Sequence, residues 1–596
     1  MNNYKAPLND LNFNFQYMLD QTQWAQLPGD ENGDLELYQS ILQQAGRFAS
    51  AVLAPINASA DREGLTIHAG VVHTPSGFKS AYQQFIAAGW NNVTLDPEFG
   101  GQGLSYTLST AVDEIMVAAN KAFMMCPGLT IGAIEAIQHS ASNALKQKYL
   151  PKLVSGEWSG TMNLTEPQAG SDVGALKTKA IEQADGHYRI HGQKIFISFG
   201  EHDLTQNIIH LVLARCTDSP EGVRGISLFL VPKYLLNDDG TLGPQNDLRC
   251  VSIEHKLGIH ASPTCVMAYG DHEGAVGYLV GEKNKGLAAM FIMINRSRLA
   301  VGVEGVAVSE RAYQAALNYA QQRIQGTDPD TGQALAIIEH ADVRRMLMIM
   351  KSQVEAMRAL SLFIAQAHDL SLGHQVPEQR QYYQGLVDLL TPVFKAWATE
   401  TSLKTTMMAI QVHGGLGYVE ETGVAQYLRD AIISVIYEGT TSIQSADLLG
   451  RKLIKDQGKN LNTLLQLMKQ SLSQLQSQAE LSDIADEFAF ALALLEQQSQ
   501  FIMQKYQQSA HAALSVSVPY LMLLGLICGA WQHAKAATHV IRLLATEPDD
   551  ADFLNSKLES ARFYHRVVLS EIRGLAHSIS HTDQLVTDFD TAYFQD

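Results

Sequence analysis

The stretch Asn163-Leu-Thr-Glu-Pro-Gln-Ala-Gly-Ser-Asp172 lies where the pattern of the chain changes from helical to strand-like. Its small residues let the backbone approach a flat or phosphorylated ligand, and successive N–H groups near Gly170 can form an anion-binding nest. Thr165 and Ser171 add hydroxyl groups. We interpret the stretch as a ligand-binding loop at a domain junction, with a polar junction loop of no further function as the alternative.

The residues before this loop are predicted to form a helical domain over residues 36–155. Leu37, Ile41 and Ala45 recur at four-residue spacing, which is typical of one apolar helix face. The Gly/Pro-rich stretch at residues 96–103 is predicted to be a loop between helices rather than a dinucleotide-binding turn, because it does not open a βαβ unit. Residues 1–35 are expected to be a polar lead-in with scattered aromatic residues.

The residues after the loop, 156–285, are predicted to form a middle β domain. Strand-like runs there are rich in β-branched and aromatic residues and are bounded by Gly, Asp, Pro and Asn. The runs are Lys194-Ile-Phe-Ile-Ser-Phe199, Ile208-Ile-His-Leu-Val-Leu213, Ile226-Ser-Leu-Phe-Leu-Val231 and Cys265-Val-Met-Ala-Tyr269. No long helical pattern separates them, so an antiparallel sheet or barrel is favoured over a βαβ sheet.

Helical patterns return over residues 286–455 and again over 460–596, with a linker expected at 456–460. The first region keeps apolar residues in steps of three or four from Met346 to Ile364, and the second carries an apolar stripe from Leu461 to Leu475. The predicted fold class is therefore mainly α, with a central antiparallel β domain, a helical bundle and an extra C-terminal helical domain.

The composition excludes several classes of protein. The chain has 596 residues, is 46% hydrophobic and carries a net charge of −18. General disorder is excluded by this hydrophobicity, and the acidic balance argues against a nucleic-acid or anionic-membrane partner. An uncharged run at residues 512–532 is interpreted as a buried helix because its densely apolar part is too short to span a bilayer.

The cysteine pattern points to a reducing compartment. The five cysteines are sparse and form no CxxC motif, which argues against a disulfide framework and a structural zinc site. His255 and His260 are not interpreted as metal ligands, so no metal is predicted. The chain start carries no signal-peptide pattern, and a cytoplasmic location is expected.

A second group of residues indicates acid–base chemistry. Glu438 follows the apolar run 432–437 and precedes Gly439. A carboxylate at the end of such a run is partly desolvated, which raises its pKa and makes it a better base near neutral pH. An exposed loop glutamate is the alternative reading of the same pattern.

Together these segments resemble the acyl-CoA dehydrogenase family over residues 35–455. The shared motifs are Gly89-Trp90, Glu98-Phe-Gly-Gly-Gln-Gly103, Tyr149-Leu-Pro-Lys-Leu-Val-Ser-Gly-Glu-Trp158, Thr165-Glu-Pro-Gln-Ala-Gly-Ser-Asp172, Gly192-Gln-Lys-Ile-Phe-Ile-Ser198, Arg298, Arg323, Gln411-Val-His-Gly-Gly415 and Tyr437-Glu-Gly-Thr440. The resemblance implies a helical domain, a β-barrel domain and a four-helix bundle. It also implies FAD, held in an extended pose and completed across a dimer interface.

The resemblance assigns the cofactor-binding residues by motif. Leu164 and Thr165 are expected along the isoalloxazine, with Phe196, Ile197 and Ser198 on its other face. The remaining residues expected near FAD are Arg323 at the pyrophosphate, Gln411, Gly414 and Gly415 at the adenosine end of a neighbouring subunit's FAD, and Thr440 and Ser442 beside the same cofactor.

The substrate residues follow in the same way. The resemblance implies that Ser171 contacts substrate or a FAD phosphate, and that Asn295, Arg298 and Gly439 lie beside the substrate. Some relatives carry their base near Arg298, but the residue there is Ser297, so Glu438 is the expected catalytic base.

The reaction implied is α,β-dehydrogenation of an acyl-CoA to the trans-2-enoyl-CoA, with electrons passed to electron-transfer flavoprotein. An acyl-CoA oxidase that uses oxygen is one alternative, and a non-catalytic helical scaffold is another. The extension after residue 455 resembles long bacterial members, which include 3-methylmercaptopropionyl-CoA dehydrogenases. The preferred acyl group stays open. We expect the C-terminal domain to dock on the chain's own bundle and the protein to be a homodimer.

Overall fold

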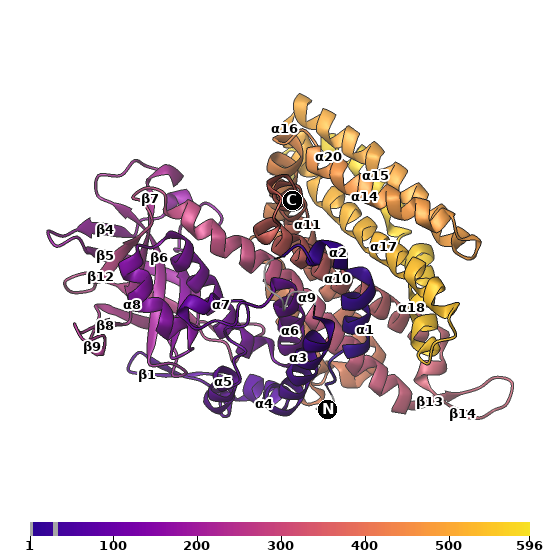
Figure 1. Cartoon of the computed structure of the whole chain (residues 1–596), viewed down its shortest axis with the longest axis horizontal. Helices are drawn as coiled ribbons and strands as arrows, with labels where there is room; N and C mark the ends of the chain where they lie inside the picture. The colour runs from indigo at the N-terminus through magenta and orange to yellow at the C-terminus, as the bar shows by residue number, and fades with distance from the viewer. Residues whose placement is uncertain (1–3, 28–33, 596) are drawn as a thin grey trace.

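The computed structural model describes residues 4–27 and 34–595. The strands between residues 66 and 280 gather at one end of the molecule, and a small hairpin over residues 324–336 lies at the other end (Figure 1). Long helices run through the middle, and the C-terminal helices stand against those long helices (Figure 1). This arrangement is the mainly α fold with a central β domain that the sequence predicts.

The N-terminal helices pack with the lead-in in one apolar core, except that the last of them, residues 143–154, lies in a core shared with the β-domain strands. They are α1 (Leu8–Phe13), α2 (Gln21–Trp24), α3 (Leu35–Phe48), α4 (Ala54–Glu63), α5 (Phe78–Ala87), α6 (Tyr106–Ala119), α7 (Lys121–Ser140) and α8 (Asn143–Val154), with a small hairpin of β1 (Thr66–His68) and β2 (Val71–His73). Side-chain caps start several of them, such as Asp34, which accepts from the Leu37 N–H at 3.0 Å. In the lead-in, Tyr4, Phe15 and Trp24 are buried in this core. The lead-in is therefore more than a polar extension, although residues 1–3 and 28–33 lie outside the described part.

The β domain forms strands at the four strand-like runs that the sequence predicts, except that Phe199 of the first run lies one residue beyond the end of its strand. Its strands are β3 (Trp158–Asn163), β4 (Lys179–Glu182), β5 (Tyr188–Ser198), β6 (Asn207–Cys216), β7 (Ile226–Pro232), β8 (Tyr234–Leu236), β9 (Leu242–Gln245), β10 (Leu248–Ile253), β11 (Thr264–Tyr269) and β12 (Ala275–Val280). The large sheet has the order β10-β11-β5-β12-β7-β6-β3, and β4 pairs with β5 and β6.

The sheet is not antiparallel throughout, because β3 and β4 both pair with β6 in parallel. A parallel pair needs a crossover of a dozen or more residues, and the chain between β3 and β6 is long enough to supply one. The predicted antiparallel sheet is thus corrected at these two pairings.

The helical bundle is built from α9 (Gly286–Gln322), α10 (Ala341–Gly373) and α11 (Pro377–His413), followed by α12 (Val424–Ile432) and α13 (Thr441–Asp447). The hairpin of β13 (Ile324–Thr327) and β14 (Ala334–Ala336) joins α9 to α10. Helices α9 and α11 approach closely, since a Cβ at Gly305 would lie 2.7 Å from the carbonyl oxygen of Ala398. Within the described residues, α9 alone is long and apolar enough to cross a membrane by length and composition, a test that core helices also pass.

The C-terminal domain packs on the bundle, as the sequence predicts. Its helices are α14 (Lys459–Gln476), α15 (Ser482–Gln508), α16 (Ala510–Ser515), α17 (Ser517–Leu544), α18 (Ala551–Phe563), α19 (Glu571–His581) and α20 (Asp583–Thr587). The expected linker is a tight turn, because α14 begins at Lys459 only five residues after the π-helical segment Leu448–Ile454. The apolar run from Tyr520 to Trp531 is buried against α10 and α11, and a Cβ at Gly525 would lie 2.5 Å from the Trp397 ring.

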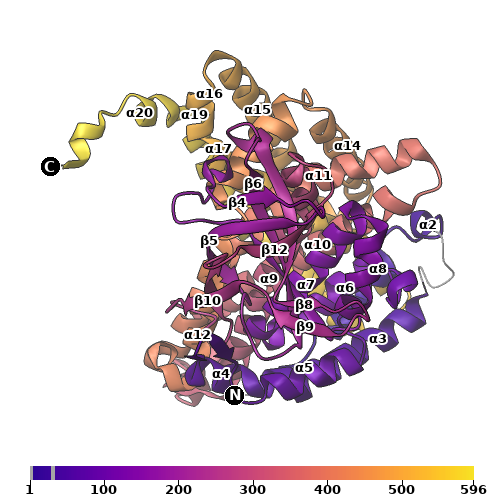
Figure 2. The same cartoon turned by 90° about the vertical axis from the view of Figure 1, so that its left-hand side faces the viewer.

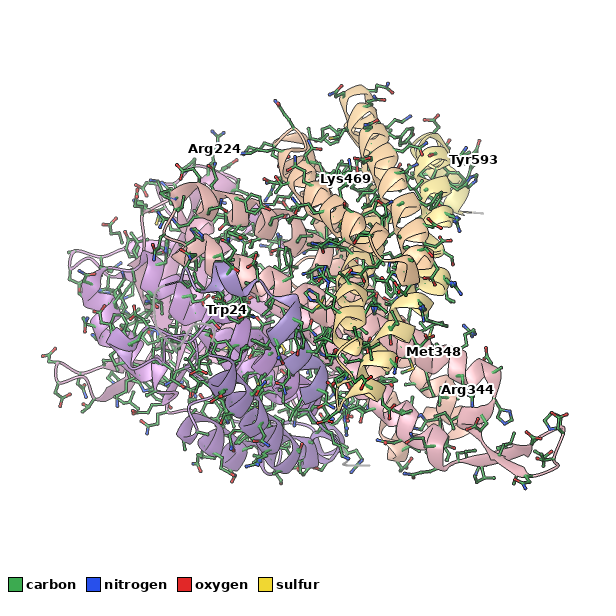
Figure 3. The ribbon with its side chains drawn as sticks, turned by 45° about the vertical axis from the view of Figure 1, so that its right-hand side comes forward. Trp24, Arg224, Arg344, Met348, Lys469 and Tyr593 are labelled. Carbon is green, nitrogen blue, oxygen red and sulfur yellow. The ribbon has the colours of Figure 1, made fainter. Side chains whose placement is uncertain are left out.

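The C-terminal domain carries ion pairs between its helices, and its C-terminal end projects (Figure 2). Figure 3 labels Lys469 on α14, and its ammonium group pairs with Glu496 of α15. Figure 2 shows the last residues, after α19, extending away from the body of the molecule.

Candidate active site

Glu438 lies in a strained turn between the 3₁₀ segment Ile433–Val435 and α13. Its φ is +55°, and φ of Gly439 is +92°, so both residues are left-handed. A glutamate rarely adopts this conformation, which costs on the order of 1 kcal/mol or more, and such residues gather at functional sites. Thr440 ends the turn by accepting a hydrogen bond from the Ile443 N–H at 3.3 Å.

The surroundings of Glu438 make its carboxyl a weak acid. Burial raises the pKa of Glu438 to about 7, and the nearby Glu304 adds to this effect, against the opposing charges of Arg298 and Lys395. A carboxylate with a pKa near the working pH can both accept and release a proton, as a general base must.

Arg298 and Asn295 both lie on α9, with different exposure, and Arg298 acts on the charge of Glu438. Arg298 is buried, and its Nη1 donates to Asp447 Oδ2 of α13 at 2.9 Å. Asn295 is exposed. The structure therefore places Arg298 in the electrostatic surroundings of Glu438 and fixes its direction through Asp447, which the sequence analysis did not single out.

The side chains of Lys395 and Gln444 hold the turn through hydrogen bonds to its backbone carbonyls. The sequence analysis did not identify either residue. Lys395 Nζ donates to the Gly439 carbonyl at 2.7 Å, and Gln444 Nε2 donates to the carbonyls of Glu438 and Gly439 at 3.0 and 3.2 Å. The signal for Lys395 is its place within the apolar run Val393-Phe-Lys-Ala-Trp397, where a charged residue needs a reason.

A buried polar group lines the turn on its other side. The Tyr437 hydroxyl donates to Glu304, and Lys121 Nζ lies 3.1 Å from Glu304 Oε2. Ser434 also donates to Glu304 at 3.0 Å. Like Lys395, Glu304 interrupts an apolar run, Val301-Gly-Val-Glu-Gly-Val306, and this run was the available signal.

The loop after β3 is held against β5 by an ion pair. Glu166 Oε1 accepts from Lys194 Nζ at 2.8 Å and from the Thr178 hydroxyl at 2.6 Å. Lys194 Nζ also donates to the Leu164 carbonyl at 3.0 Å, and the Ile195 N–H donates to the Thr165 carbonyl at 2.9 Å. Leu164 and Thr165, both expected along the flavin, are thereby fixed.

Both members of this pair are charged at neutral pH. Burial alone would raise the pKa of Glu166, but the Lys194 charge and the surrounding donors outweigh it and lower the pKa to about 2. Burial lowers the pKa of Lys194 to about 8, against the opposing charge of Glu166.

The three β5 residues expected at the flavin differ in what they present. Phe196 has φ of +60° and a 60% exposed side chain, and Ser198 is half-buried. Ile197 is buried in the β-domain core, so only its backbone can face a ligand. Ser171 is exposed in the loop after β3. An exposed aromatic ring on a strained backbone suits a stacking surface for a flat ligand.

A separate group of predicted residues lies at the far end of the bundle. Arg323 ends α9 and is exposed, with Nη2 donating to Gln325 Oε1 at 3.1 Å. Gln411 lies in the last turn of α11, and the space above Gly414 and Gly415 is open. The two helix ends meet where the Tyr319 and His413 rings stack at 4.4 Å. A guanidinium beside open glycine backbone suits a phosphate-bearing ligand. Ser442 is exposed on α13, beside Thr440 and apart from this end.

The residues expected at the flavin and the residues around Arg323 lie at different levels along α9. Strand β3 packs on α7 at Gly160, and α7 packs on α9 at Met293, since Cβ atoms at Gly160 and Gly132 would meet Ala133 and Met293. From Met293 to Arg323 a helix rises about 45 Å at 1.5 Å per residue. The residues expected at the two ends of FAD therefore lie at distant levels of one chain.

The described residues offer little for a metal. Within 4–27 and 34–595, no group of three or more His, Cys, Asp or Glu lies together in a way that could hold an ion. The five cysteines are free and buried.

Family models match nearly the whole chain. They are the acyl-CoA dehydrogenase N-terminal domain over residues 36–157, the middle domain over 161–271 and the C-terminal domain over 284–453. A further model, described as acetyl-CoA dehydrogenase C-terminal like, matches residues 464–590.

Similar proteins cover the full length. The 3-methylmercaptopropionyl-CoA dehydrogenase of Ruegeria pomeroyi is 44% identical over 98% of this chain and 99% of its own. A butyryl-CoA dehydrogenase of Syntrophomonas wolfei is 35% identical over 98% of both chains. The crystal structure of an acyl-CoA dehydrogenase complexed with FAD from Bacillus anthracis has a TM-score of 0.75 at 20% identity, covering 95% of this chain and 91% of that one.

Proposed function

The chain belongs to the acyl-CoA dehydrogenase family of FAD-dependent oxidoreductases, and we propose that Glu438 is the base with which it converts an acyl-CoA to the trans-2-enoyl-CoA. The observation that carries this proposal is the Glu438 turn. Its carboxyl has a pKa raised to about 7 by burial and sits on a left-handed backbone beside the buried Arg298.

In this mechanism Glu438 removes the proton from the carbon next to the thioester carbonyl. FAD held by Leu164, Thr165, Phe196 and Ser198 would supply the acceptor for the β-hydrogen, which leaves as hydride. The C–H group next to the thioester carbonyl is a very weak acid. The site must therefore stabilise the enolate oxygen with correctly oriented hydrogen-bond donors, worth roughly 3–4 kcal/mol each. The Glu438 N–H is one candidate, since it makes no hydrogen bond within the described part of the chain.

The FAD site is proposed to join two chains. Leu164, Thr165, Phe196 and Ser198 would hold the flavin end, and Arg323 with the open glycines after α11 would hold the other end of a neighbour's FAD. The exposed Phe196 ring and the open space above Gly414 support this division.

For the acyl group we propose a short chain such as 3-methylmercaptopropionyl. The support is the relative from Ruegeria pomeroyi, at 44% identity over nearly the full length of both chains. Butyryl-CoA is the second candidate, supported by the Syntrophomonas wolfei relative at 35% identity. Steady-state rates with a panel of acyl-CoA chain lengths and a ferrocenium acceptor would rank these substrates.

The electron acceptor is proposed to be electron-transfer flavoprotein, in the cytoplasm. The alternative, an oxidase, would use oxygen. Anaerobic reduction of a dye without peroxide formation in air supports the dehydrogenase, and stoichiometric peroxide supports the oxidase. A protein purified without yellow colour, and unable to take up FAD, would instead favour a scaffold that keeps the fold.

The test of the base is Glu438→Gln. Glutamine has nearly the same shape but cannot accept the proton, so turnover should fall by about 100-fold or more with bound FAD unchanged. Glu221→Gln, which changes an exposed glutamate of the β domain, is the matched control and should behave as wild type. A Glu438→Gln protein with more than about a tenth of the wild-type rate would assign the base to another residue.

A further inference from the structure

We propose that Lys395 and Gln444 are positioning residues of the catalytic turn, holding the backbone of Glu438 and Gly439 so that the carboxylate faces the substrate. This inference rests on the proposed role of Glu438 as the base. Neither residue is proposed to contact the substrate. Each acts through its hydrogen bonds to the backbone of the turn.

Lys395 is placed where a lysine is costly. It lies in the middle of α11, is 0% exposed, and has apolar neighbours along the helix. Burying an ammonium group is unfavourable unless hydrogen bonds and charges compensate it. The one hydrogen bond that its Nζ makes within the described residues is the 2.7 Å bond to the Gly439 carbonyl. The buried ammonium group of Lys395 therefore bonds directly to the backbone of the turn.

Gln444, in the first turn of α13, supplies the other side-chain hydrogen bonds to the turn. Its buried Nε2 bridges the carbonyls of Glu438 and Gly439 at 3.0 and 3.2 Å. A Cβ at Gly439 would lie 2.7 Å from this nitrogen. The glycine and the amide therefore fit each other closely, and the two adjacent left-handed residues have their carbonyls fixed by two side chains.

The charges around the turn are otherwise paired. Glu438 faces Arg298 and Glu304 from α9 and Lys395 from α11. Arg298 is paired with Asp447 at 2.9 Å, and Glu304 with Lys121 at 3.1 Å.

Lys395 stands apart among these groups. It faces Glu304, Glu438, Arg298 and Glu400, but within the described part of the chain no carboxylate lies within 4 Å of its Nζ. Its charge therefore acts on Glu438 at longer range, favouring the ionised base, while its hydrogen bond shapes the turn.

The two effects can be separated by substitution. Lys395→Met removes both the charge and the donor, whereas Lys395→Gln removes the charge and keeps a donor. Gln444→Met removes the hydrogen bonds from the Gln444 amide to the turn and leaves the Lys395 charge in place. Lys404→Met, an exposed lysine of the same helix that pairs with Glu571, is the matched control.

The measurements are kcat, KM, the pH profile of kcat/KM, FAD content and melting temperature. We expect Lys395→Met to lower kcat about tenfold or more with little change in KM or FAD content, because small misplacements of a reacting group are costly. Its acid limb should move to higher pH, since Glu438 has lost a neighbouring cation. Lys395→Gln should regain part of kcat but keep the shifted limb, and Gln444→Met should lower kcat without the shift.

A purely structural role for Lys395 predicts a different result. It would lower the melting temperature and leave kcat and the acid limb at wild-type values, and that outcome overturns the inference. If Lys395→Met does not fold, Lys395→Gln and Gln444→Met decide in the same way. An active Glu438→Gln protein would instead overturn the proposed base, whereas an inactive one with a wild-type-like Lys395→Met protein would overturn only the positioning role.

Discussion

Glu438 combines an unfavourable backbone with an unfavourable environment for its charge. Both the positive φ and the raised pKa cost stability, and the surrounding residues sustain them. Because the folded pKa lies above the ordinary value, the unfolded chain binds fewer protons between these pKa values. This group therefore lowers stability as pH rises from about 4.5 to about 7. A position kept at such a cost fits a catalytic role better than a structural one.

The raised pKa gives a prediction for activity. The base must be ionised to accept a proton, so kcat/KM should increase with pH and level off above an apparent pKa of about 7. A pH profile in the free-enzyme regime measures this value. In the Glu221→Gln control the limb should stay in place. A limb near the ordinary carboxyl value would mean that Glu438 is not desolvated in the working enzyme.

Helix α9 sets the distances in the site. It begins against β7, since a Cβ at Gly286 would meet Leu228, and it ends at Gln322 beside the exposed Arg323. The catalytic turn faces its middle, through Glu304 and Arg298. One helix thus separates the residues expected at the flavin from the residues expected at the other end of FAD, and two chains can bring them together.

This separation predicts complementation between two inactive variants. Arg323→Ala should lose FAD on dialysis, because a charge-assisted contact to pyrophosphate is removed. Glu438→Gln should keep FAD without turnover. In a mixed dimer one site carries both changes and the other carries neither, so co-expression should restore activity to about a quarter of the sites. Activity per bound FAD, measured after dialysis, reports the result.

The control for complementation is a mixture of Glu438→Gln with the double variant Glu438→Gln/Arg323→Ala, which contains no intact base. Its activity should stay at the level of the parents. If the first mixture also stays there while mixed dimers are present, each FAD site is contained in one chain.

At the scale of the whole molecule, the N-terminal lead-in and the C-terminal domain are tied together across the bundle. Asp10 accepts from Lys557 and from Arg358, both at 2.6 Å. Arg358 also donates to Glu114 and Glu310. This buried cluster therefore connects the lead-in, the N-terminal helical domain, the bundle and the C-terminal domain. Removing one partner of a buried ion pair costs about 3–5 kcal/mol.

The C-terminal domain is therefore predicted to be part of the folding unit. A chain ending at Lys455 would lose Lys557 and expose the bundle surface that α17 covers, and exposed apolar patches of this size lead to association. Light scattering should show a homodimer for the full chain and aggregates for the shortened one. A full-length tetramer, or a shortened chain that stays a well-behaved dimer, would contradict this prediction.

The sequence by itself determined the elements and the motifs. Apolar residues at helical spacing marked α3, α10 and α14, and β-branched runs marked β5, β6, β7 and β11. These signals are local, because a helix or strand repeats its environment every few residues. The Thr165 and Glu438 motifs could be recognised for the same reason, since each occupies a short stretch.

The tertiary structure decided which distant residues meet. Lys395 reaches the Gly439 carbonyl across 44 positions, and Lys557 reaches Asp10 across 547. It also decided that β3 pairs in parallel with β6 and that Arg323 lies far along α9 from the loop after β3. A lysine in an apolar run predicts a buried partner but not its identity. That identity depends on how whole helices pack, and packing is fixed by shape complementarity over surfaces that no short window of sequence contains.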